Sequence, residues 1–496
     1  MIIVAITGPT LEDARAQLRV SSRYADMVEF RLDMMQDVPR QELTPACRRP
    51  WIATCRPKRE GGAYTGGEEE RLHILGEAAR AGAAFVDIEL DAVREFRRML
   101  AAKRIHPNLI VSKHHFEDQL PDVGKNYRAL RATRADVVKL AFKATDAWQL
   151  SLVRKFLERA SRDRQKAIAV AMGAPGEASR ILYRVLGGWA TYAAPEQGDS
   201  SAPGQLSASA LRSVFHAHER TKRTRVFGLV GNPVGQSKGI YIHNPIYRSA
   251  GYDGVYVRFQ VADLGRFMKE MGPSLSGCSV TLPHKREMLR YCSSLSPGAA
   301  AIGAVNTIVR KQRGWHGANT DAEGALEAIG MRIGVEGKRL AIVGAGGAAR
   351  AIAMEAKRRG ANVVIVNRTE ANSRTLAGDL EVEWATPERL SELAPEVLVN
   401  ATPAGMWPDI ENTPVAAIPA SVRLAFDAIY NPPMTRFLTM ARDQGIEVVT
   451  GVEMYARQAV GQIRLLTGVK ISSARVQRVF ERVSAAGTPQ SLKVRS

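Results

Sequence analysis

A lysine inside an apolar run is the first residue of this sequence that could do unusual chemistry. Lys139 lies in the segment VVKLAF, between two valines and a leucine. Apolar neighbours desolvate an ammonium group, which would lower the pKa and leave an amine able to attack a ketone and form a Schiff base. The same position also suits a lysine whose stem lies on apolar surface while its charge reaches water. From these residues alone both interpretations stay open.

A second stretch, VGAGGAARA, is typical of a turn that binds a dinucleotide. It follows the strand-like run LAIV, and Gly344, Gly346 and Ala349 fit the G-x-G-x-x-G/A pattern. The two glycines allow a tight turn and let a pyrophosphate approach the helix N-terminus, while Ala349 lets helix and strand pack closely. The predicted cofactor contacts in this turn are Gly344, Ala345, Gly346, Gly347 and Ala348.

Residues beyond the next strand indicate the form of the cofactor. NAD sites usually carry an acidic residue about 20 positions after the glycines, where it binds the ribose 2′-hydroxyl. This sequence has Asn367, Arg368 and Thr369 there. An arginine suits a 2′-phosphate and can stack on adenine. The sequence therefore predicts NADP(H), with Arg374 as a further cation nearby.

The elements that must position Lys139 alternate between strand and helix over residues 1–217. The strand-like runs are 2–7, 25–33, 51–57, 84–90, 108–115, 136–142, 167–173 and 190–194. Amphipathic stretches between them, such as LEDARAQLRV, are long enough for one helix each. The overall class is therefore α/β, and the alternating pattern of residues 1–217 predicts a (β/α)8 barrel. The chemistry of such a barrel lies at the carboxyl ends of its strands. Polar residues gather at those ends, including His114 and His115.

The second half begins a new α/β pattern. The polar segment HAHERTKRTR ends where a strand-like run, VFGLVG, begins, so we predict a linker at residues 218–225. An α/β substrate-binding domain is predicted for residues 226–330, completed by residues 430–483, and a Rossmann-type NADP domain for residues 331–429. Residues 484–496 are predicted to form a disordered tail.

Composition indicates a soluble globular protein in the cytoplasm. Of 496 residues 45% are apolar, no apolar run is long enough for a membrane span, and the first residues lack a signal-peptide pattern. Cys47, Cys55, Cys278 and Cys292 show no CxxC spacing, which predicts reduced thiols and no metal site. The net charge of +19 would suit a nucleic acid, but the basic residues are scattered, so we predict a surface that attracts anionic small molecules.

Six motifs carry a resemblance to the type I 3-dehydroquinate dehydratase family. They are EFRLD, TCRPKREGG, SKHHF, ADVVKLA, EASRIL and SAPGQ, in this order. The resemblance implies that Lys139 is the Schiff-base lysine, His114 the general acid and base, and Glu60 the group that positions the histidine. It also implies a substrate pocket lined by Glu29, Arg31, Arg56, Met172, Arg180, Ser201 and Gln205, with Arg180 as the partner of the substrate carboxylate.

The chemistry explains why these residue types are needed. Elimination of water from a β-hydroxy ketone requires removal of a weakly acidic proton beside the carbonyl. An iminium on Lys139 supplies the electron sink, so a neutral imidazole such as His114 is basic enough to take that proton. His114 can then return the proton to the departing hydroxyl, and no metal is required.

Seven further motifs resemble the shikimate dehydrogenase family. They are GNPVGQSKGIYIHN, SVTLPHK, GAVNT, GANTDAEGA, NATPAGM, FDAIY and GVEMYARQA, between residue 226 and about residue 483. The resemblance implies a catalytic pair, Lys285 and Asp321, since an ammonium can protonate the alkoxide left by hydride delivery and a carboxylate can hold that ammonium. The implied substrate contacts are Ser237, Thr281, Asn306, Tyr430 and Gln458.

Together the two resemblances predict a bifunctional enzyme of the shikimate pathway, with its domains in the order of the plant fusion. The barrel would convert 3-dehydroquinate to 3-dehydroshikimate, and the second half would reduce that product to shikimate with NADPH. Gly239 stands where the family has a second serine for the substrate carboxylate, so a quinate/shikimate dehydrogenase acting catabolically is an alternative. A non-catalytic regulatory protein that binds DNA is another, and the presence of the catalytic residues argues against it.

Overall fold

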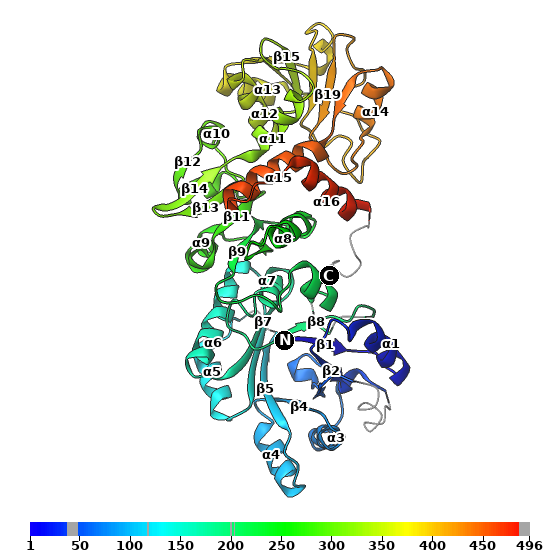
Figure 1. Ribbon diagram of the computed structural model, residues 1–496, viewed down its shortest axis with the longest axis vertical. Helices are drawn as coiled ribbons and strands as arrows, with labels where there is room; N and C mark the ends of the chain where they lie inside the picture. Colours follow the sequence, from blue (N-terminus) through cyan, green and yellow to red (C-terminus); the bar gives the residue numbers. More distant parts are fainter. Residues whose placement is uncertain (37–47, 117–118, 199–200, 203, 486–496) are drawn as a thin grey trace. The chain divides into compact units, whose positions relative to one another are not determined.

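The computed structural model of the chain describes residues 1–36, 48–116, 119–198, 201–202 and 204–485 (Figure 1). These residues form two compact units, Met1–Leu275 and Ser276–Ala486. Of the sequence-based predictions, Cys47 and residues 486–496 of the expected tail lie outside the described residues.

The first unit begins with a barrel of eight parallel strands. They are β1 (Ile2–Ile6), β2 (Met27–Arg31), β3 (Trp51–Thr54), β4 (Phe85–Glu89), β5 (Asn108–His115), β6 (Val137–Lys143), β7 (Lys166–Met172) and β8 (Thr191–Ala193). Their order in the sheet is β7-β6-β5-β4-β3-β2-β1-β8. Beside β8, the Trp189 N–H donates to the Ala167 carbonyl of β7 at 2.8 Å, so the barrel is nearly closed. The predicted barrel is confirmed.

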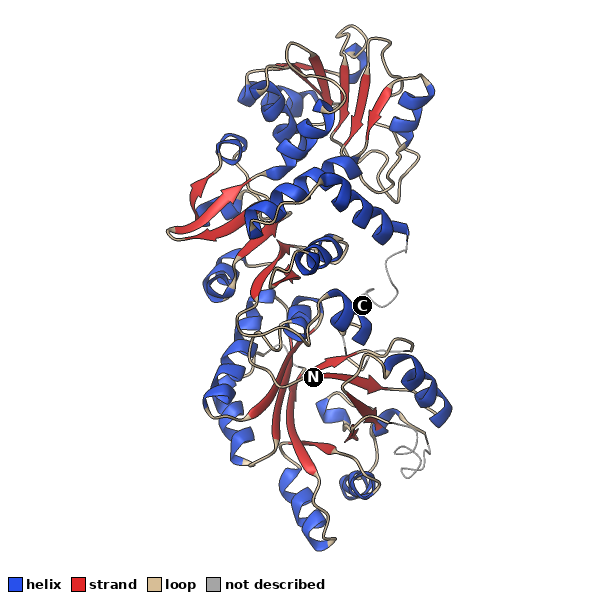
Figure 2. Cartoon of the chain, viewed as in Figure 1, coloured by secondary structure: helices blue, strands red, loops and turns tan. Residues whose placement is uncertain are grey.

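Helices lie outside the strands (Figure 2). They are α1 (Leu11–Ser21), α3 (Glu68–Arg80), α4 (Val93–Ala102), α5 (Val123–Ala132), α6 (Leu150–Arg162), the short α7 (Glu177–Ile181) and a π-helical turn, Ala210–Val214. In α6 the buried Val153, Phe156, Leu157 and Ala160 recur at helical spacing. This apolar stripe is what holds such a helix against a sheet.

Strand alternation decides which side chains lie inside the barrel. Val137 and Ala141 of β6 belong to the apolar cluster that fills it, and Lys139 lies between them at a spacing of two. In β5, Ile110 belongs to the same cluster and Ser112 follows two residues later. The interior is therefore apolar along the strands and becomes polar toward their carboxyl ends.

The first unit continues beyond the barrel into β9 (Arg225–Gly231), α8 (Gly239–Ser249), β10 (Gly254–Gln260) and α9 (Leu264–Glu270). The predicted linker at residues 218–225 carries buried side chains: Arg220 is 8% exposed and Thr224 4%. Arg220 Nε also donates to the Phe215 carbonyl at 2.9 Å. Arg220 can be buried in this segment because the stem of its side chain is apolar and its guanidinium donates to the Phe215 carbonyl.

The second unit begins with a small mixed sheet. In it β11 (Gly277–Val280) pairs antiparallel with β13 (Thr307–Lys311), β13 pairs antiparallel with β14 (Gly314–Ala318), and β14 pairs parallel with β12 (Cys292–Leu295). Helix α10 (Pro297–Ile302) lies between β12 and β13 in sequence, and α11 (Thr320–Gly330) follows β14.

A doubly wound parallel sheet follows, drawn from green through yellow to orange in Figure 1. Its strands are β15 (Arg339–Val343), β16 (Asn362–Val366), β17 (Glu383–Ala385), β18 (Val397–Asn400), β19 (Leu424–Asp427) and β20 (Glu447–Val449). The order β17-β16-β15-β18-β19-β20 is that of dinucleotide-binding folds. Helices α12 (Gly347–Arg358), α13 (Glu370–Leu380) and α14 (Arg436–Asp443) belong to it, and α15 (Gly451–Thr467) and α16 (Ser473–Ala485) end the described chain.

Both faces of this sheet are covered, because alternate residues of each strand point to opposite sides. Leu340 and Ile342 pack with Ile352 of α12, whereas Ala341 and Val343 pack with helix α14. The predicted Rossmann-type domain ended at residue 429. The sheet extends further, since β20 pairs parallel with β19, so α14 and β20 belong to the nucleotide-binding part and not to the substrate domain.

Candidate active sites

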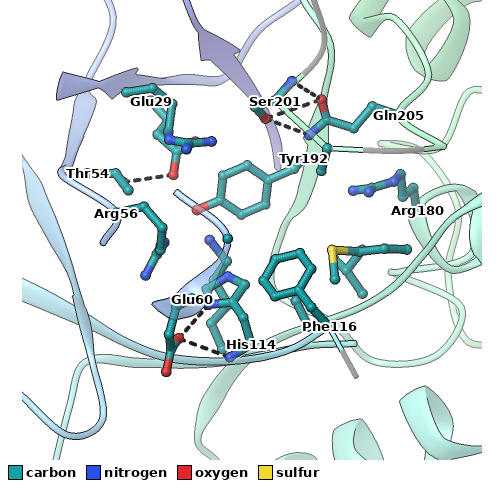
Figure 3. A pocket seen from close by; sticks show the side chains of 17 residues that line it. Glu29, Thr54, Arg56, Glu60, His114, Phe116, Arg180, Tyr192, Ser201 and Gln205 are labelled. Atoms are coloured by element: carbon teal, nitrogen blue, oxygen red, sulfur yellow. Dashed lines mark hydrogen bonds and ion pairs between the residues drawn. The ribbon is translucent and has the colours of Figure 1, made fainter. Parts of the chain in front are cut away.

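A cavity of about 130 Å³ opens at the carboxyl ends of the barrel strands. All ten barrel residues predicted for the first site line it: Glu29, Arg31, Arg56, Glu60, His114, Lys139, Met172, Arg180, Ser201 and Gln205. The sequence thus located the pocket although these residues come from strands and loops far apart in the chain. Figure 3 shows how the labelled side chains surround the cavity.

Lys139 has a charged partner and an aromatic one. Its Nζ donates to Asp87 Oδ2 at 2.8 Å and lies 4.1 Å from the centre of the Tyr192 ring. The apolar run VVKLAF does not describe the surroundings of this amine, because Val138 and Leu140 are strand neighbours of Lys139 and point to the opposite face. The amine therefore lies at the bottom of the pocket beside a carboxylate.

Asp87 is the centre of a buried charge network. Arg56 NH2 lies 2.8 Å from Asp87 Oδ1, and the Ser112 hydroxyl donates to the same oxygen at 2.6 Å. Burial raises the pKa of this carboxyl, but the cations Arg56 and Lys139 outweigh it and hold the pKa below its ordinary value. Asp87 is therefore ionised, which keeps Lys139 fixed in position when no substrate is bound.

His114 is oriented by Glu60. Glu60 Oε2 lies 2.9 Å from His114 Nδ1 and accepts the His114 backbone N–H at 3.1 Å. Because an ionised carboxylate only accepts, Nδ1 carries the ring proton and Nε2 remains as the basic nitrogen. Gly61, which follows Glu60, has φ +75°, and a Cβ there would lie 2.1 Å from the Phe116 ring.

The electrostatic setting keeps the His114 ring neutral. Its pKa is well below the ordinary histidine value, first because the ring is buried and second because Arg56 and Lys139 are cations nearby. Asp87 acts in the opposite direction but does not outweigh them. A neutral imidazole with one oriented nitrogen is the form that removes a proton.

The other side of the pocket offers groups for an anionic, hydroxyl-bearing ligand. Figure 3 shows Arg180 across the pocket from Glu60 and Arg56. Burial lowers the pKa of Arg180 to about 10, so the guanidinium is still charged near neutral pH. Ser201 and Gln205 hydrogen-bond to each other, with Gln205 Nε2 donating to the Ser201 hydroxyl at 3.0 Å.

Several functional neighbours were not predicted. They are Asp87, Thr54, Phe116 and Tyr192. Thr54 donates to Glu29 Oε1 at 2.8 Å, which fixes that carboxylate at the pocket wall. The signal for Asp87 was present in AFVDIEL, where it lies two residues before Glu89 and so shares the inward face.

The two residues predicted as the catalytic pair of the second site lie in contact. Lys285 Nζ donates to Asp321 Oδ2 at 2.6 Å. Asp321 lies in the first turn of α11, and its backbone N–H is capped by the Asn319 side chain at 3.1 Å. A carboxylate is favoured at a helix N-terminus by the helix dipole, and the position of Asp321 beside Lys285 fits this preference.

The residues predicted to contact the substrate of the second site differ in burial and in the elements that carry them. Asn306 is 2% exposed, and its Oδ1 accepts the Thr320 N–H at 3.0 Å; Thr320 Oγ1 is 3.5 Å from Gln458 Oε1. Tyr430 packs against aromatic rings of α15 and α16. Thr281 follows β11, and Ser237 lies in the first unit, where it accepts the Gly239 N–H at 3.2 Å.

The glycine-rich turn has the geometry that a bound pyrophosphate needs. Gly344 has φ +117°, and a Cβ there would lie 3.0 Å from the Ala401 carbonyl oxygen, so only glycine fits. No atom lies within 4 Å of a Cβ built on Gly346 or Gly347, so the space before the α12 N-terminus is open. Ala349 is fully buried against the sheet, as predicted.

The cations predicted for the 2′-phosphate differ in their surroundings. Arg368 is exposed and follows β16 by two residues. Asn367 Nδ2 donates to the Thr369 carbonyl at 2.9 Å, which shapes this turn. Arg374 pairs with Glu370 at 2.5 Å and lies 4.6 Å over the Trp384 ring. Arg374 therefore already has a charged and an aromatic partner, whereas the assignment of Arg368 to the 2′-phosphate rests on its sequence position.

Three general expectations can be compared with the described residues. Cys55, Cys278 and Cys292 take part in no disulfide among the described residues. Within the described ranges no three His, Cys, Asp or Glu side chains are grouped so that they could hold a metal ion. No described helix combines the length and the apolar character that crossing a membrane requires.

Comparison with known proteins gives two family matches. Type I 3-dehydroquinase matches residues 2–222, and the shikimate dehydrogenase substrate binding domain matches residues 229–308. The bifunctional 3-dehydroquinate dehydratase/shikimate dehydrogenase of Arabidopsis thaliana chloroplasts is 35% identical over 473 residues, which are 90% of this chain and 78% of the plant protein. Shikimate biosynthesis protein AroDE of Chlamydia pneumoniae is 26% identical, covering 94% and 95%. Shikimate dehydrogenase (NADP(+)) of Caldanaerobacter subterraneus is 34% identical over 49% of this chain and 92% of its own.

Proposed function

The chain belongs to the family of bifunctional 3-dehydroquinate dehydratases/shikimate dehydrogenases, and from this we infer that it catalyses two successive steps of the shikimate pathway. The barrel dehydrates 3-dehydroquinate to 3-dehydroshikimate, and the second half reduces that product to shikimate with NADPH. One observation carries this conclusion: the barrel cavity brings Lys139, His114 and Glu60 together, and a separate pair, Lys285 and Asp321, is formed elsewhere in the chain.

In the first reaction Lys139 attacks the ketone and releases water, giving an iminium. Asp87 holds the amine before the attack and offers an anion beside the iminium charge afterwards. His114 Nε2 removes the proton next to the iminium carbon, and the electron pair moves into the enamine. The same nitrogen then protonates the hydroxyl, which leaves as water while the enamine electron pair forms the new double bond and restores the iminium, so the histidine ends as it began. Water finally hydrolyses this iminium, which releases 3-dehydroshikimate and returns the amine of Lys139. Arg180 is proposed to bind the substrate carboxylate, and Glu29, Arg31, Arg56, Met172, Ser201 and Gln205 to line the substrate.

In the second reaction Lys285 donates a proton to the substrate oxygen as it becomes an alkoxide, and Asp321 holds and tunes the ammonium. The open turn at Gly346 and Gly347 fits a pyrophosphate at the α12 N-terminus, and Arg368 and Arg374 are proposed to bind a 2′-phosphate. When bound, NADP(H) supplies the hydride. Ser237, Thr281, Asn306, Tyr430 and Gln458 remain proposed substrate contacts.

The preferred substrate of the second half is shikimate, with quinate as the second candidate. Gly239 favours the latter, since the hydroxyl expected there is missing. A cytoplasmic location and the absence of a nucleic-acid partner remain proposals. The basic surface implied by the net charge of +19 would then attract the anionic substrates of both halves.

Separate inactivation of the two sites tests the proposal. Lys139→Ala should abolish dehydration and leave NADP-linked oxidation of shikimate nearly unchanged. Lys285→Ala should do the reverse, so that 3-dehydroshikimate accumulates from 3-dehydroquinate and NADPH. Loss of both activities in either variant, in a protein that retains its circular dichroism and thermal unfolding, would contradict two independent sites.

A further inference from the structure

Two carboxylates of the barrel reach the segment that follows it, within the first compact unit. Glu177 is the first residue of α7, beyond β7, and Asp146 precedes the turn Ala147–Gln149, beyond β6. Both therefore lie at the face of the barrel that carries the pocket. Their partners lie in β10 and at the start of α9.

The contact with β10 is a buried two-pronged ion pair. Arg258 Nε donates to Glu177 Oε1 at 3.0 Å, and Arg258 Nη2 donates to Glu177 Oε2 at 2.6 Å. The side chains are only 5% and 3% exposed. Such a pair fixes the orientation of the guanidinium, and removal of one partner leaves a buried charge without compensation.

The remaining terminal nitrogen of Arg258 holds the loop between β9 and α8. Its NH1 donates to the Gly235 carbonyl at 2.7 Å. Two residues later comes Ser237, which is proposed to contact the substrate of the second reaction, and its hydroxyl accepts the Gly239 N–H at 3.2 Å. A single side chain thus connects the barrel with the loop that carries Ser237.

On the barrel side the same ion pair begins close to the first pocket. Glu177 and Arg180 lie one turn apart in α7, every residue of which is buried, and Arg180 lines the cavity. A second contact supports the geometry, since Asp146 Oδ2 accepts the N–H groups of Ala262 and Asp263 at 2.9 and 2.8 Å. Glu177 therefore joins the helix that carries Arg180 to Arg258 through a buried contact.

We propose that Glu177 is a positioning residue for the second reaction: through Arg258 and Gly235, the barrel holds the Ser237 loop in the conformation that binds the substrate carboxylate. This inference rests on the proposed function, and in particular on Ser237 as a substrate contact. Glu177 itself touches neither substrate. A dehydrogenase without a barrel lacks this ion pair, so the link belongs to the fused chain.

Steady-state kinetics of the full-length chain tests the link. The variants are Glu177→Gln, Arg258→Gln and their combination, and Lys155→Gln is the matched control because its pair with Glu270, at 2.9 Å, joins the same two segments on the exposed surface. The KM for shikimate should rise about five- to tenfold in each single variant while kcat stays within about twofold. The KM of the double variant should be no higher than that of the single variant with the higher KM. The KM of Lys155→Gln should equal that of the unsubstituted chain.

Dehydration of 3-dehydroquinate reports whether each variant is folded. An unchanged KM for shikimate in a Glu177→Gln protein that still dehydrates would overturn the link, and so would additive effects in the double variant. If Glu177→Gln does not fold, the Arg258→Gln variant and the shorter Glu177→Asp variant decide by the same criterion. Absence of shikimate oxidation in the unsubstituted chain would instead overturn the proposed function and this inference with it.

Discussion

Glu60 Oε2 contacts His114 twice, at 2.9 Å from the ring Nδ1 and at 3.1 Å from the backbone nitrogen. The carboxylate thereby fixes both the tautomer and the orientation of the ring. Glu60→Gln keeps the shape but removes the charge, so we expect kcat for dehydration to fall about 10- to 100-fold with little change in shikimate oxidation. Glu69→Gln, at an exposed position of α3, is the control, and equal kcat values for both variants would contradict the role of Glu60.

The pH dependence of dehydration follows from the lowered pKa of His114. The base works only when neutral, and burial together with Arg56 and Lys139 keeps it neutral to lower pH. An ordinary histidine has a pKa of about 6.5. The midpoint of the acid limb of kcat/KM for 3-dehydroquinate should therefore lie below that pH. Initial rates across the acid range measure it. An acid limb with its midpoint above that value would show that the cations do not govern the ring.

We expect Gly239 to affect how the substrate carboxylate fits in the second reaction. A Cβ at this position would lie 3.3 Å from both Ser237 Oγ and Tyr256 Cε1, so a side chain fits if these neighbours move slightly. Gly239→Ser should raise kcat/KM for shikimate about two- to tenfold, as expected for one hydrogen bond of about 0.5 to 1.5 kcal/mol. Gly239→Ala adds the Cβ without the hydroxyl, and an equal gain there would exclude a hydrogen bond as the cause.

Arg368 is the expected discriminator between NADP and NAD. Its charge would bind the 2′-phosphate, which NAD lacks, so Arg368→Ala should raise the KM for NADP⁺ much more than that for NAD⁺. Arg374→Ala is the comparison, because Arg374 is already paired with Glu370 and stacked on Trp384. Equal effects of Arg368→Ala on the KM values of the two cofactors would show that Arg368 does not bind the 2′-phosphate.

Alternation and motif register predicted most of the barrel site. The strand runs predicted Lys139 and His114 on barrel strands, and the family motifs identified residues such as Arg180 that lie outside the strands. The inward direction of Asp87 could be predicted from AFVDIEL, but its contact with Lys139 depends on the pairing of β4, β5 and β6, which no local pattern contains. The surroundings of a buried side chain are set by other strands, not by its own neighbours in the chain.

Domain limits were harder to predict than the site. The segment 218–225 is rich in charge and was predicted as a linker, yet Arg220 and Thr224 are buried in it. Strand β20 is only three residues long, Glu447–Val449, which is too short for a periodic signal. Its place in the nucleotide-binding sheet depends on pairing with β19 and on the packing of α14, both of which are long-range contacts.

Trapping of the imine tests whether Lys139 forms the Schiff base in the first reaction. Borohydride added with 3-dehydroquinate should reduce the iminium and leave one cyclic adduct on the chain, which peptide mass spectrometry should place on Lys139. Lys143 lies on the same strand but is exposed, so it serves as an internal comparison. We expect an adduct on Lys139 alone in the unsubstituted chain, and no adduct in the Lys139→Ala variant. An adduct on Lys143 instead of Lys139, or full dehydration activity without any trapped lysine, would contradict it.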